Sequence, residues 1–504
     1  MGAVLEESEK GSGSLSFAIA FSAIVATSFC FALRALVIDD WGIAFGLSET
    51  QKGELLGVGL WPFSITIVLL SLLVDRIGFK ATFWFAAACH VSGLALVLTA
   101  TGYWSLYVGT LVMALGNGAV EAAANPLIAT LYRRDKATWL NRLHAGWPGG
   151  LVLSGLMAIA LGAGVGWRVK VALMALPLAT YAVLLIRGRF PVSERVSAGV
   201  SYKAMLAEGG FLSAGVVIAL AMLEVGRIAG LNALTVALAI GLLTAGYAAV
   251  SRSAGRPLYL ILVLIMIPQA ITELSTDSWI SSLMEPEMTH LGLQAGWVLV
   301  YTAMLMFVVR IFAGSVIHRL KPLGVLAMAS ALAAMGLFLL AGATGPALMA
   351  AATLYGVGKS FFWGTSLGVA SEQFPEGGAI TINFMAGAGM LAAGILGSVM
   401  LGTAQDHATT RALADYDAAH GSAFAATYLS APKTGLFGSY EALDPRKLAA
   451  APAADREVLK GVAAASKKAA LRDVAVLPVV TLLAYIGLIV RFRLRGGYRP
   501  VTLE

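Results

Sequence analysis

The stretch LVMALGNGAVEAAANPLIATLY, residues 111–132, decides the fold class of this chain. It is apolar over the length of a membrane-spanning helix, since about 20 such residues cross the hydrocarbon core of a bilayer. It carries one acidic residue, Glu121, at bilayer depth, where insertion scales put the cost of a charge at about 2.5–3.5 kcal/mol. Such a residue normally faces a bundle interior or a water-filled path, so the stretch predicts a functional helix in a membrane protein.

The composition extends this prediction to the whole chain. Of its 504 residues, 58% are hydrophobic and 12% are charged, whereas soluble domains carry about 25% charged residues. Apolar runs of helical length recur, which indicates an all-α polytopic membrane protein and not a β-barrel. No signal peptide is expected at the N-terminus. Cys30 and Cys89 fall inside apolar runs, which favours core packing over a disulfide.

The apolar runs predict about fourteen spans, arranged as six, two and six. Their expected positions are about 15–38, 52–73, 81–101, 105–132, 143–164, 168–187, then 209–226 and 229–250, then 258–282, 293–317, 323–342, 346–370, 379–404 and 472–490. The division that follows is a tail (1–14), a first six-helix half (15–187), a linker with two extra helices (188–257), a second half (258–490) and a tail (491–504).

Lys and Arg set the expected orientation, because they are enriched in short cytoplasmic loops. With the N-terminus inside, eighteen of them fall in the inner loops and the C-tail and four in the outer loops, so we expect both termini in the cytoplasm. A single middle helix would invert the second half and place Arg319 outside. The polar stretch 405–471 is then an external loop that could form short amphipathic helices or remain mobile.

The two six-span sets look like copies of one another. Asp75-Arg76 and the following Lys80 come after the second span, and His318-Arg319-Leu320-Lys321 comes after its counterpart 243 positions later. GNGAVEAAANPLIATLY (116–132) and GVGKSFFWGTSLGVASE (356–372) align at an offset of 240. Two similar offsets indicate a duplication. Six-span repeats with a solute site at their interface are typical of one group of transporters.

Two motifs carry a family resemblance. SLLVDRIGFK (71–80) resembles the Gly-x-x-x-Asp-Arg-x-Gly-Arg-Arg loop of the major facilitator superfamily, with Ser71 in place of its first Gly, and VVRIFAGSVIHR (308–319) resembles the eighth span of that superfamily. The resemblance implies an alternating-access fold. It also implies a gating role for the cytoplasmic Asp75, Arg76 and Arg319, and a helix-locking role for Arg310.

A third motif narrows the resemblance. EAAANP (121–126) and the later Leu140-Asn141 pair are similar to the fucose–galactose–gluconate type of proton symporter. In that group the fourth-span Glu takes part in proton-coupled sugar binding and a first-span Asp is the proton site. The likeness therefore implies a sugar-like solute. Arg34 stands at roughly the position of that Asp, so the coupling chemistry of this chain differs.

The residues themselves favour Glu121 as a proton-binding group, because a carboxyl in a low dielectric can exchange a proton near neutral pH. The bland alternative is a fixed ion pair with Arg34. Arg34 stays charged; it could pair with Glu121 or with an anionic solute, or it could snorkel toward Asp39 and Asp40. Asn125 lies one turn from Glu121 on the same face, and Pro126 frees a backbone carbonyl there, although a simple kink is the alternative.

Asn141, His144 and Trp147 begin the fifth span at i, i+3 and i+6. His144 could relay protons near neutral pH and Trp147 could stack on a sugar ring. Asn141 and His144 lie near the cytoplasmic end of the span. Packing at that end is therefore at least as good an interpretation for both.

Glu273 and Asp277 lie at i and i+4, on one face of a span that Pro268 loosens. Two such carboxylates repel, so one is expected to be protonated unless Lys359 or Arg310 lies near. The pair is a candidate for solute or proton handling. Alternatively, Asp277 lies at the outer water boundary and Lys359 snorkels.

These features predict a secondary active transporter in the cell (inner or plasma) membrane that moves a small polar solute, a sugar in the first instance, by alternating access with proton symport. The alternatives are a proton-coupled exporter of amphipathic compounds and a transporter-like sensor. No Walker A motif, zinc spacing or nucleophile elbow occurs in the sequence. We therefore expect no enzyme activity, cofactor, metal or nucleic-acid partner. The expected partners are the solute, protons and the lipid bilayer, and the chain is expected to be a monomer.

Overall fold

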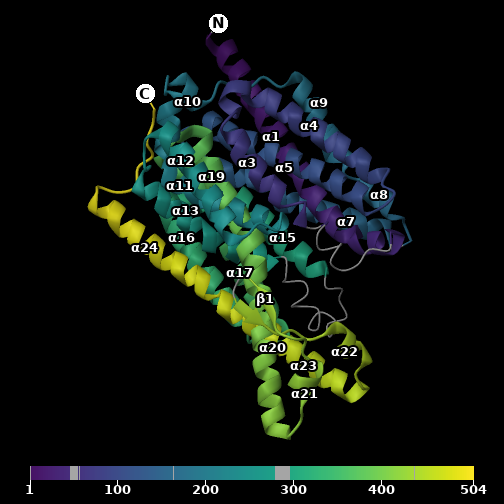
Figure 1. The fold of residues 1–504 in the computed structure, drawn as a ribbon. Coiled ribbons are helices and arrows are strands. Elements are labelled where there is room, and N and C mark those ends of the chain that lie inside the picture. Colours follow the sequence, from purple (N-terminus) through teal and green to yellow (C-terminus); the bar gives the residue numbers. More distant parts are fainter. Residues whose placement is uncertain are drawn as a thin grey trace.

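The computed structural model describes residues 2–45, 55, 57–162, 164–277, 296–435 and 438–503. Over these ranges the protein is almost entirely helical, as predicted (Figure 1). The strands in this part of the chain are β1 (Lys433–Gly435) and β2 (Gly438–Tyr440), which form one antiparallel pair.

The helices up to residue 251 form the first part of the bundle and a middle pair. They are α1 (Gly2–Phe45), α3 (Trp61–Ser71), α4 (Val74–Leu98), α5 (Tyr103–Leu131), α6 (Lys136–His144), α7 (Gly146–Leu161), α8 (Trp167–Ala172), α9 (Ala175–Arg187), α10 (Glu194–Ser197), α11 (Tyr202–Ile228) and α12 (Ala233–Ser251).

The helices after residue 251 form the second part of the bundle and a projecting subdomain. They are α13 (Pro257–Ala270), the π-helix η1 (Ile271–Ser275), α15 (Gly296–Ile311), α16 (Ala313–Leu340), α17 (Pro346–Lys359), α18 (Phe362–Gln373), η2 (Pro375–Gly377), α19 (Gly378–Leu391), the π-helix η3 (Ala392–Gly397), α20 (Ser398–His420), α21 (Phe424–Tyr428), α22 (Pro445–Ala450), α23 (Ala453–Val474) and α24 (Val476–Leu494).

Ten helices among the described residues are long and apolar enough to cross a membrane, and Trp61–Ser71 and Val300–Ile311 are shorter apolar helices. The count of fourteen spans is therefore not confirmed and stays a prediction. The expected ends of three spans, at 52–54, 278–282 and 293–295, lie outside the described residues.

The middle pair, α11 and α12, lies on the outside of the bundle. The two helices pack on each other, and α11 also contacts α19 and α13. Most of α12 is exposed on the outside of the protein, and its apolar side chains Leu234, Leu238 and Leu242 are among the exposed ones. An apolar helix with a bare outer surface suits a lipid environment, where such side chains need no protein cover.

The two ends of the bundle differ. The beginning of α1 and the C-terminal tail lie at one end, which we call the terminal face (Figure 1). The tail is fixed there, because the backbone N–H of Val501 donates to the carbonyl of Glu372 at 2.8 Å. The opposite end, which we call the loop face, carries the projecting subdomain formed by α20 to α23.

The subdomain contains the described residues of the polar stretch, 405–435 and 438–471, in folded form. Its long helices α20 and α23 pack on each other and lead from α19 and into α24. A small core of its own forms around Leu413, Tyr428, Leu429, Ala451 and Leu459. The described residues of this stretch are therefore mostly helical, but two of the helices, with 23 and 22 residues, are longer than the expected short ones.

Asp417 organises the turn after α20. Its carboxylate accepts from the hydroxyl of Ser422 at 2.6 Å and from the backbone N–H groups of Phe424 and Ala425 at 2.7 and 2.9 Å. The bond from Ser422 is the largest of the effects that lower the pKa of this carboxyl below its ordinary value. A carboxylate whose pKa is lowered in the folded state stabilises that state above its ordinary pKa, and the stabilisation is lost as the pH falls through the folded value.

We therefore expect Asp417→Asn to speed hydrogen–deuterium exchange of residues 422–428 at neutral pH. In the unchanged protein, the protection of the same segment relative to its intrinsic exchange rate should begin to fall only when the pH drops below the ordinary Asp value of about 3.9. Asp415→Asn, at an exposed position of the same helix, is the matched control. Equal exchange in the two variants would contradict the capping role.

Candidate functional site

Pro126 opens the backbone of α5 at the centre of the bundle. Proline has no N–H, so the carbonyl of Ala122 one turn earlier loses its helical partner. The side chain of Asn383 on α19 fills this place, because its Nδ2 donates to the Ala122 carbonyl at 3.1 Å. Helix α19, from the second part of the bundle, thus binds a carbonyl in the first part that is free because of Pro126.

Glu121 and Asn125 lie together on the same face of α5. Asn125 Nδ2 donates to Glu121 Oε2 at 2.9 Å, and Glu121 is 4% exposed. The i, i+4 spacing that the sequence indicates is realised as a direct hydrogen bond. A longer contact of 3.5 Å joins Asn125 Nδ2 to Asn383 Oδ1.

His144 completes this cluster from α6. Its Nε2 lies 2.9 Å from Asn125 Oδ1. An amide oxygen only accepts, so Nε2 carries the proton in the neutral ring and Nδ1 presents a lone pair. That lone pair lies 3.9 Å from Glu121 Oε1. This distance is longer than a hydrogen bond, so a proton between the two groups is held either on the carboxyl or on the ring.

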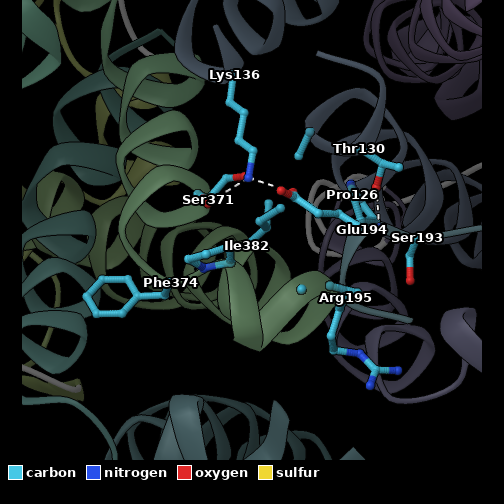
Figure 2. A pocket seen from close by; sticks show the side chains of 13 residues that line it. Pro126, Thr130, Lys136, Ser193, Glu194, Arg195, Ser371, Phe374 and Ile382 are labelled. Atoms are coloured by element: carbon cyan, nitrogen blue, oxygen red, sulfur yellow. Dashed lines mark hydrogen bonds and ion pairs between the residues drawn. The ribbon is translucent and has the colours of Figure 1, made fainter. Parts of the chain in front are cut away.

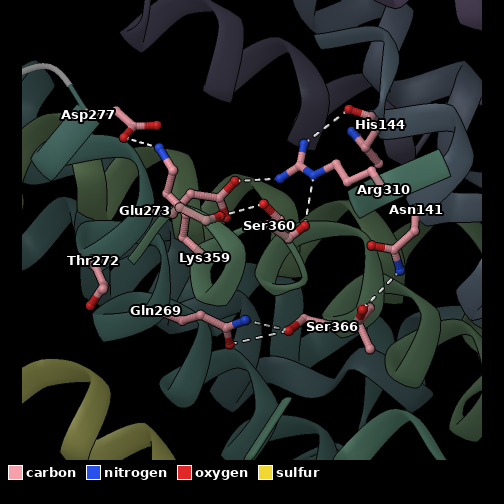
Figure 3. A network of polar contacts seen from close by, with 12 residues as sticks. Asn141, His144, Gln269, Thr272, Glu273, Asp277, Arg310, Lys359, Ser360 and Ser366 are labelled. Atoms are coloured by element: carbon pink, nitrogen blue, oxygen red, sulfur yellow. Dashed lines mark hydrogen bonds and ion pairs between the residues drawn. The ribbon is translucent and has the colours of Figure 1, made fainter. Parts of the chain in front are cut away.

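Arg310 forms a second cluster and joins the two parts of the bundle (Figure 3). Its Nη2 pairs with Glu273 Oε1 at 2.5 Å, its Nε donates to the carbonyl of Ser360 at 2.9 Å, and its Nη1 donates to the carbonyl of His144 at 3.0 Å. The His144 carbonyl is free because Pro148, four residues later, has no N–H. The sequence motif predicts helix locking for Arg310; the structure places it instead in this central network, 2% exposed.

Lys359 pairs with Asp277 at the loop-face side of the same network (Figure 3). Lys359 is buried, 1% exposed, and its Nζ lies 5.2 Å from the centre of the Tyr355 ring. Snorkelling of Lys359 is therefore wrong. Glu273 and Asp277 each have a cation, so their mutual repulsion does not require either to be protonated.

Several buried polar atoms of the central region have no hydrogen-bond partner among the described residues. They are Glu273 Oε2, Asn141 Oδ1, Thr276 Oγ1 and Arg34 Nε. Unpaired buried polar atoms are costly, and they are rare in folded proteins unless a water, ion or ligand completes them. This set contains donors and acceptors, which suits a polyhydroxyl ligand.

The other predicted residues of the site lie around these clusters. Asn141 Nδ2 donates to Thr365 Oγ1 on α18 at 2.9 Å. Trp147 is half-buried, and its ring lies 5.5 Å from that of Phe31. Arg34 is buried but forms no ion pair with Glu121 in the described part of the chain, so the expected pairing of these two is not seen.

The predicted gating residues lie at the terminal face, where they differ in their contacts. Asp75 Oδ2 accepts from Arg195 Nε at 2.7 Å. The guanidinium of Arg76 lies over the ring of Tyr202, 4.4 Å from its centre. Arg319 is exposed, and no ion pair of it occurs among the residues that the structure describes.

A second network at the terminal face joins both parts of the bundle around a small cavity of about 20 Å³, room for about one water molecule (Figure 2). Lys136 Nζ pairs with Glu194 Oε2 at 2.7 Å and donates to the Ser371 carbonyl at 3.2 Å. Glu372 Oε1 accepts from the backbone N–H of Ala137 at 3.2 Å, and its Oε2 accepts from Tyr498 at 2.7 Å. These contacts close the terminal face.

Glycines bring the closing helices α6 and α18 into backbone contact. A Cβ atom on Gly368 would lie 2.4 Å from the Cα of Ala137, and one on Gly364 would lie 2.8 Å from the Cα of Asn141. Real side chains do not approach so closely, so the closed terminal face requires glycine at both positions.

We therefore expect Gly368→Val to open the terminal face. Overpacking costs about 1–3 kcal/mol, so the reaction of a reporter cysteine at Ala129 with a thiol reagent applied at that face should rise roughly 5- to 150-fold. Both native cysteines are replaced by serine in this assay. Gly246→Val on α12, where a Cβ meets open space, is the matched control. Equal labelling of the two variants would show that this contact does not hold the face closed.

Sequence reasoning missed several residues that now belong to the two networks. Asn383, Thr365 and Glu372 each contact a residue more than 200 positions away. Glu194 and Arg195 fall in the polar linker after residue 187. The only available signal was the pair of prolines, since Pro126 and Pro148 mark the carbonyls that Asn383 and Arg310 occupy.

The comparisons with known proteins agree with this architecture. Residues 15–399 match the family model of the Major Facilitator Superfamily. The chain therefore belongs to this superfamily, a family of multi-pass membrane transporters that are not enzymes, and it is a secondary transporter of small solutes. No curated protein matches the chain by sequence.

Solved structures show the same fold at low identity. One is FucP, the fucose:proton symporter of E. coli, with 16% identity, a TM-score of 0.55 and coverage of 94% of this chain and 99% of that chain; another FucP structure, in the outward conformation, has a TM-score of 0.57. The proton:xylose symporter XylE has 15% identity, a TM-score of 0.58 and coverage of 82% and 91%. The human organic anion transporter MFSD10 has 12% identity, a TM-score of 0.59 and coverage of 95% and 99%.

Proposed function

We propose that this protein is a proton symporter of a sugar-like solute in the cell membrane, working by alternating access. The observation that carries the proposal is the buried cluster of Glu121, Asn125 and His144, where α5 and α6 meet Asn383 of α19. The cluster holds a place for one proton, and the second part of the bundle contacts it directly. A proton bound there can bias how the two parts pack.

The polar centre supports a hydroxylated solute. The partnerless atoms of Glu273, Asn141 and Thr276 need donors and acceptors, and the rings of Trp363 and His144 lie 6.3 Å apart beside them. An exporter of amphipathic compounds would instead need a large apolar cavity. The fucose and xylose symporters, which have the same fold at low sequence identity, add weaker support.

The state of the protein fits the proposal. The network of Lys136, Glu194 and Glu372 closes the terminal face, and Lys and Arg enrichment predicts that this face is cytoplasmic. The described conformation is then the one closed toward the cytoplasm, from which alternating access gives the solute and proton their entry from the other side. Release to the cytoplasm requires the contacts of Lys136, Glu194 and Glu372 to separate.

The test is the pH outside lightly buffered, anaerobic cells that express the protein, measured while sugars and sugar derivatives are added. We expect alkalinisation with at least one of them, because the solute carries protons inward. A protonophore should remove the signal. Uptake of labelled solute without any pH change, and unaffected by the protonophore, would show a uniporter and overturn proton symport.

A further inference from the structure

Arg34 is the cation of the central region whose charge the described residues leave uncompensated. It is 2% exposed, and its Nε has no partner in the described part of the chain. Arg310 pairs with Glu273 and Lys359 pairs with Asp277. A buried cation without a counter-ion is costly in a bilayer.

Among the described residues, Asp40 and Gly59 define the surroundings of Arg34. Asp40, toward which it could snorkel, pairs with Lys170 at 3.3 Å. The guanidinium lies against Gly59, where a Cβ atom would come within 1.8 Å of Arg34 Nη1. Glycine at this position therefore makes the room for a planar, fully charged group inside the bundle.

The position of Arg34 suits a solute that arrives from the loop face. α1 runs from the terminal face to the loop face, and Arg34 lies toward the latter end of its spanning stretch, Gly13–Ile38. Glu121 lies in the second half of α5, which runs the opposite way. Arg34 is thus nearer the loop face than the Glu121–His144 pair.

The charges at the centre sum to zero only for some combinations of bound proton and bound solute. The central helices carry three cations (Arg34, Arg310 and Lys359) and three carboxylates (Glu121, Glu273 and Asp277). The set is neutral when Glu121 and His144 together carry no extra proton. It gains one positive charge when either of them binds a proton, and Arg310, which faces both from α15, adds to the cost of that charge.

We propose that the solute is anionic, a sugar acid whose carboxylate binds Arg34, and that it travels with one proton held by the Glu121–His144 pair. This inference rests on the proposed proton symport and adds the charge of the solute. Guanidinium groups bind carboxylates through two parallel hydrogen bonds, which an unpaired Arg can offer and a paired one cannot.

This charge balance explains why transport of the solute is coupled to transport of the proton. The empty carrier without a proton and the carrier with both proton and carboxylate are neutral at the centre. A carrier with only one of the two has an uncompensated buried charge, which disfavours repacking of the helices around it. Only the two neutral forms then change state readily, so solute and proton move together and no net charge crosses the membrane.

The test uses the purified full chain in liposomes, with labelled D-glucuronate and D-galacturonate and the matching neutral sugars D-glucose and D-galactose. A pH gradient is imposed with the voltage clamped by potassium and valinomycin, and separately a voltage is imposed without a pH gradient. We expect the pH gradient to drive accumulation of a sugar acid and the voltage to have no effect. Proton-driven uptake of a neutral sugar only, sensitive to voltage, would overturn this inference and leave the proposed symport intact.

Arg34→Gln separates recognition from folding. Loss of a charge-assisted contact should reduce uptake of the acid roughly 10- to 100-fold, and Arg34→Lys should restore part of it. Arg227→Gln, at an exposed Arg that pairs with Glu224 on α11, is the matched control. Gel filtration checks that each variant is folded, and thermal stabilisation by the two sugar acids is a second readout. Equal uptake and equal stabilisation in Arg34→Gln and the control would overturn the role of Arg34, and an absence of both with every acid would overturn the anionic solute.

Discussion

Glu121→Gln is expected to abolish accumulation of the solute against its gradient while leaving exchange of solute across the membrane intact. Glutamine keeps the size of the side chain and can still bond with Asn125, but it cannot take up and release a proton. The shared position between Glu121 Oε1 and His144 Nδ1, 3.9 Å apart, then no longer holds a transferable proton. The measurement is uptake into liposomes under a pH gradient, beside counterflow without one.

Glu224→Gln is the matched control, because Glu224 is a carboxylate paired with Arg227 on α11, away from the central clusters. It should behave as the unchanged protein in both assays. If Glu121→Gln accumulates solute normally with an unchanged pH dependence, the carboxyl of Glu121 is not the coupling group. If it loses counterflow as well, Glu121 is needed to hold the solute and not only the proton.

Among single substitutions in the central network, removal of Arg310 is expected to lower the free energy of unfolding the most. Its guanidinium holds Glu273 and two backbone carbonyls, and Arg310→Met leaves a buried carboxylate without a counter-ion. Breaking a buried pair from one side typically costs about 3–5 kcal/mol. Thermal unfolding in detergent should show a corresponding fall in the free energy of unfolding.

The double variant Arg310→Met with Glu273→Gln tests the cause. It removes the stranded charge and should recover much of the lost stability, although the carbonyls of His144 and Ser360 still lack their donor. Glu208→Gln, which breaks a pair with the exposed Arg256, is the control for a pair nearer water and should cost much less. If the double variant is no more stable than Arg310→Met, the carbonyl contacts of Arg310 matter more than its charge.

Local features of the site could be predicted from the sequence because they depend on helical spacing. The bond between Glu121 and Asn125 follows from i, i+4 geometry, and the freed carbonyls follow from Pro126 and Pro148. The superfamily follows from loop motifs such as SLLVDRIGFK. Each of these depends on residues close together in the chain.

The partners across the bundle could not be predicted in the same way. Asn383 meets Ala122 across 261 positions, and no periodic pattern marks which polar residue of a distant helix will arrive at a given carbonyl. The ion pair of Arg34 and Glu121, the alternative interpretation of Glu121, is not seen among the described residues. The sequence indicates the depth of Arg34 in the membrane, but the direction in which its side chain points depends on the room left by Gly59.

The subdomain on the loop face has a mechanical consequence. α20 follows α19, whose Asn383 docks on α5, through the π-helix η3. It extends for 23 residues, about 35 Å at 1.5 Å per residue. If α20 tilts with α19 by about 10°, its far end moves by about 6 Å. Residues near Gly421 would then move further than the helices inside the bundle. A pair of spectroscopic probes placed there and on α8 would report how the bundle repacks, from positions outside the lipid.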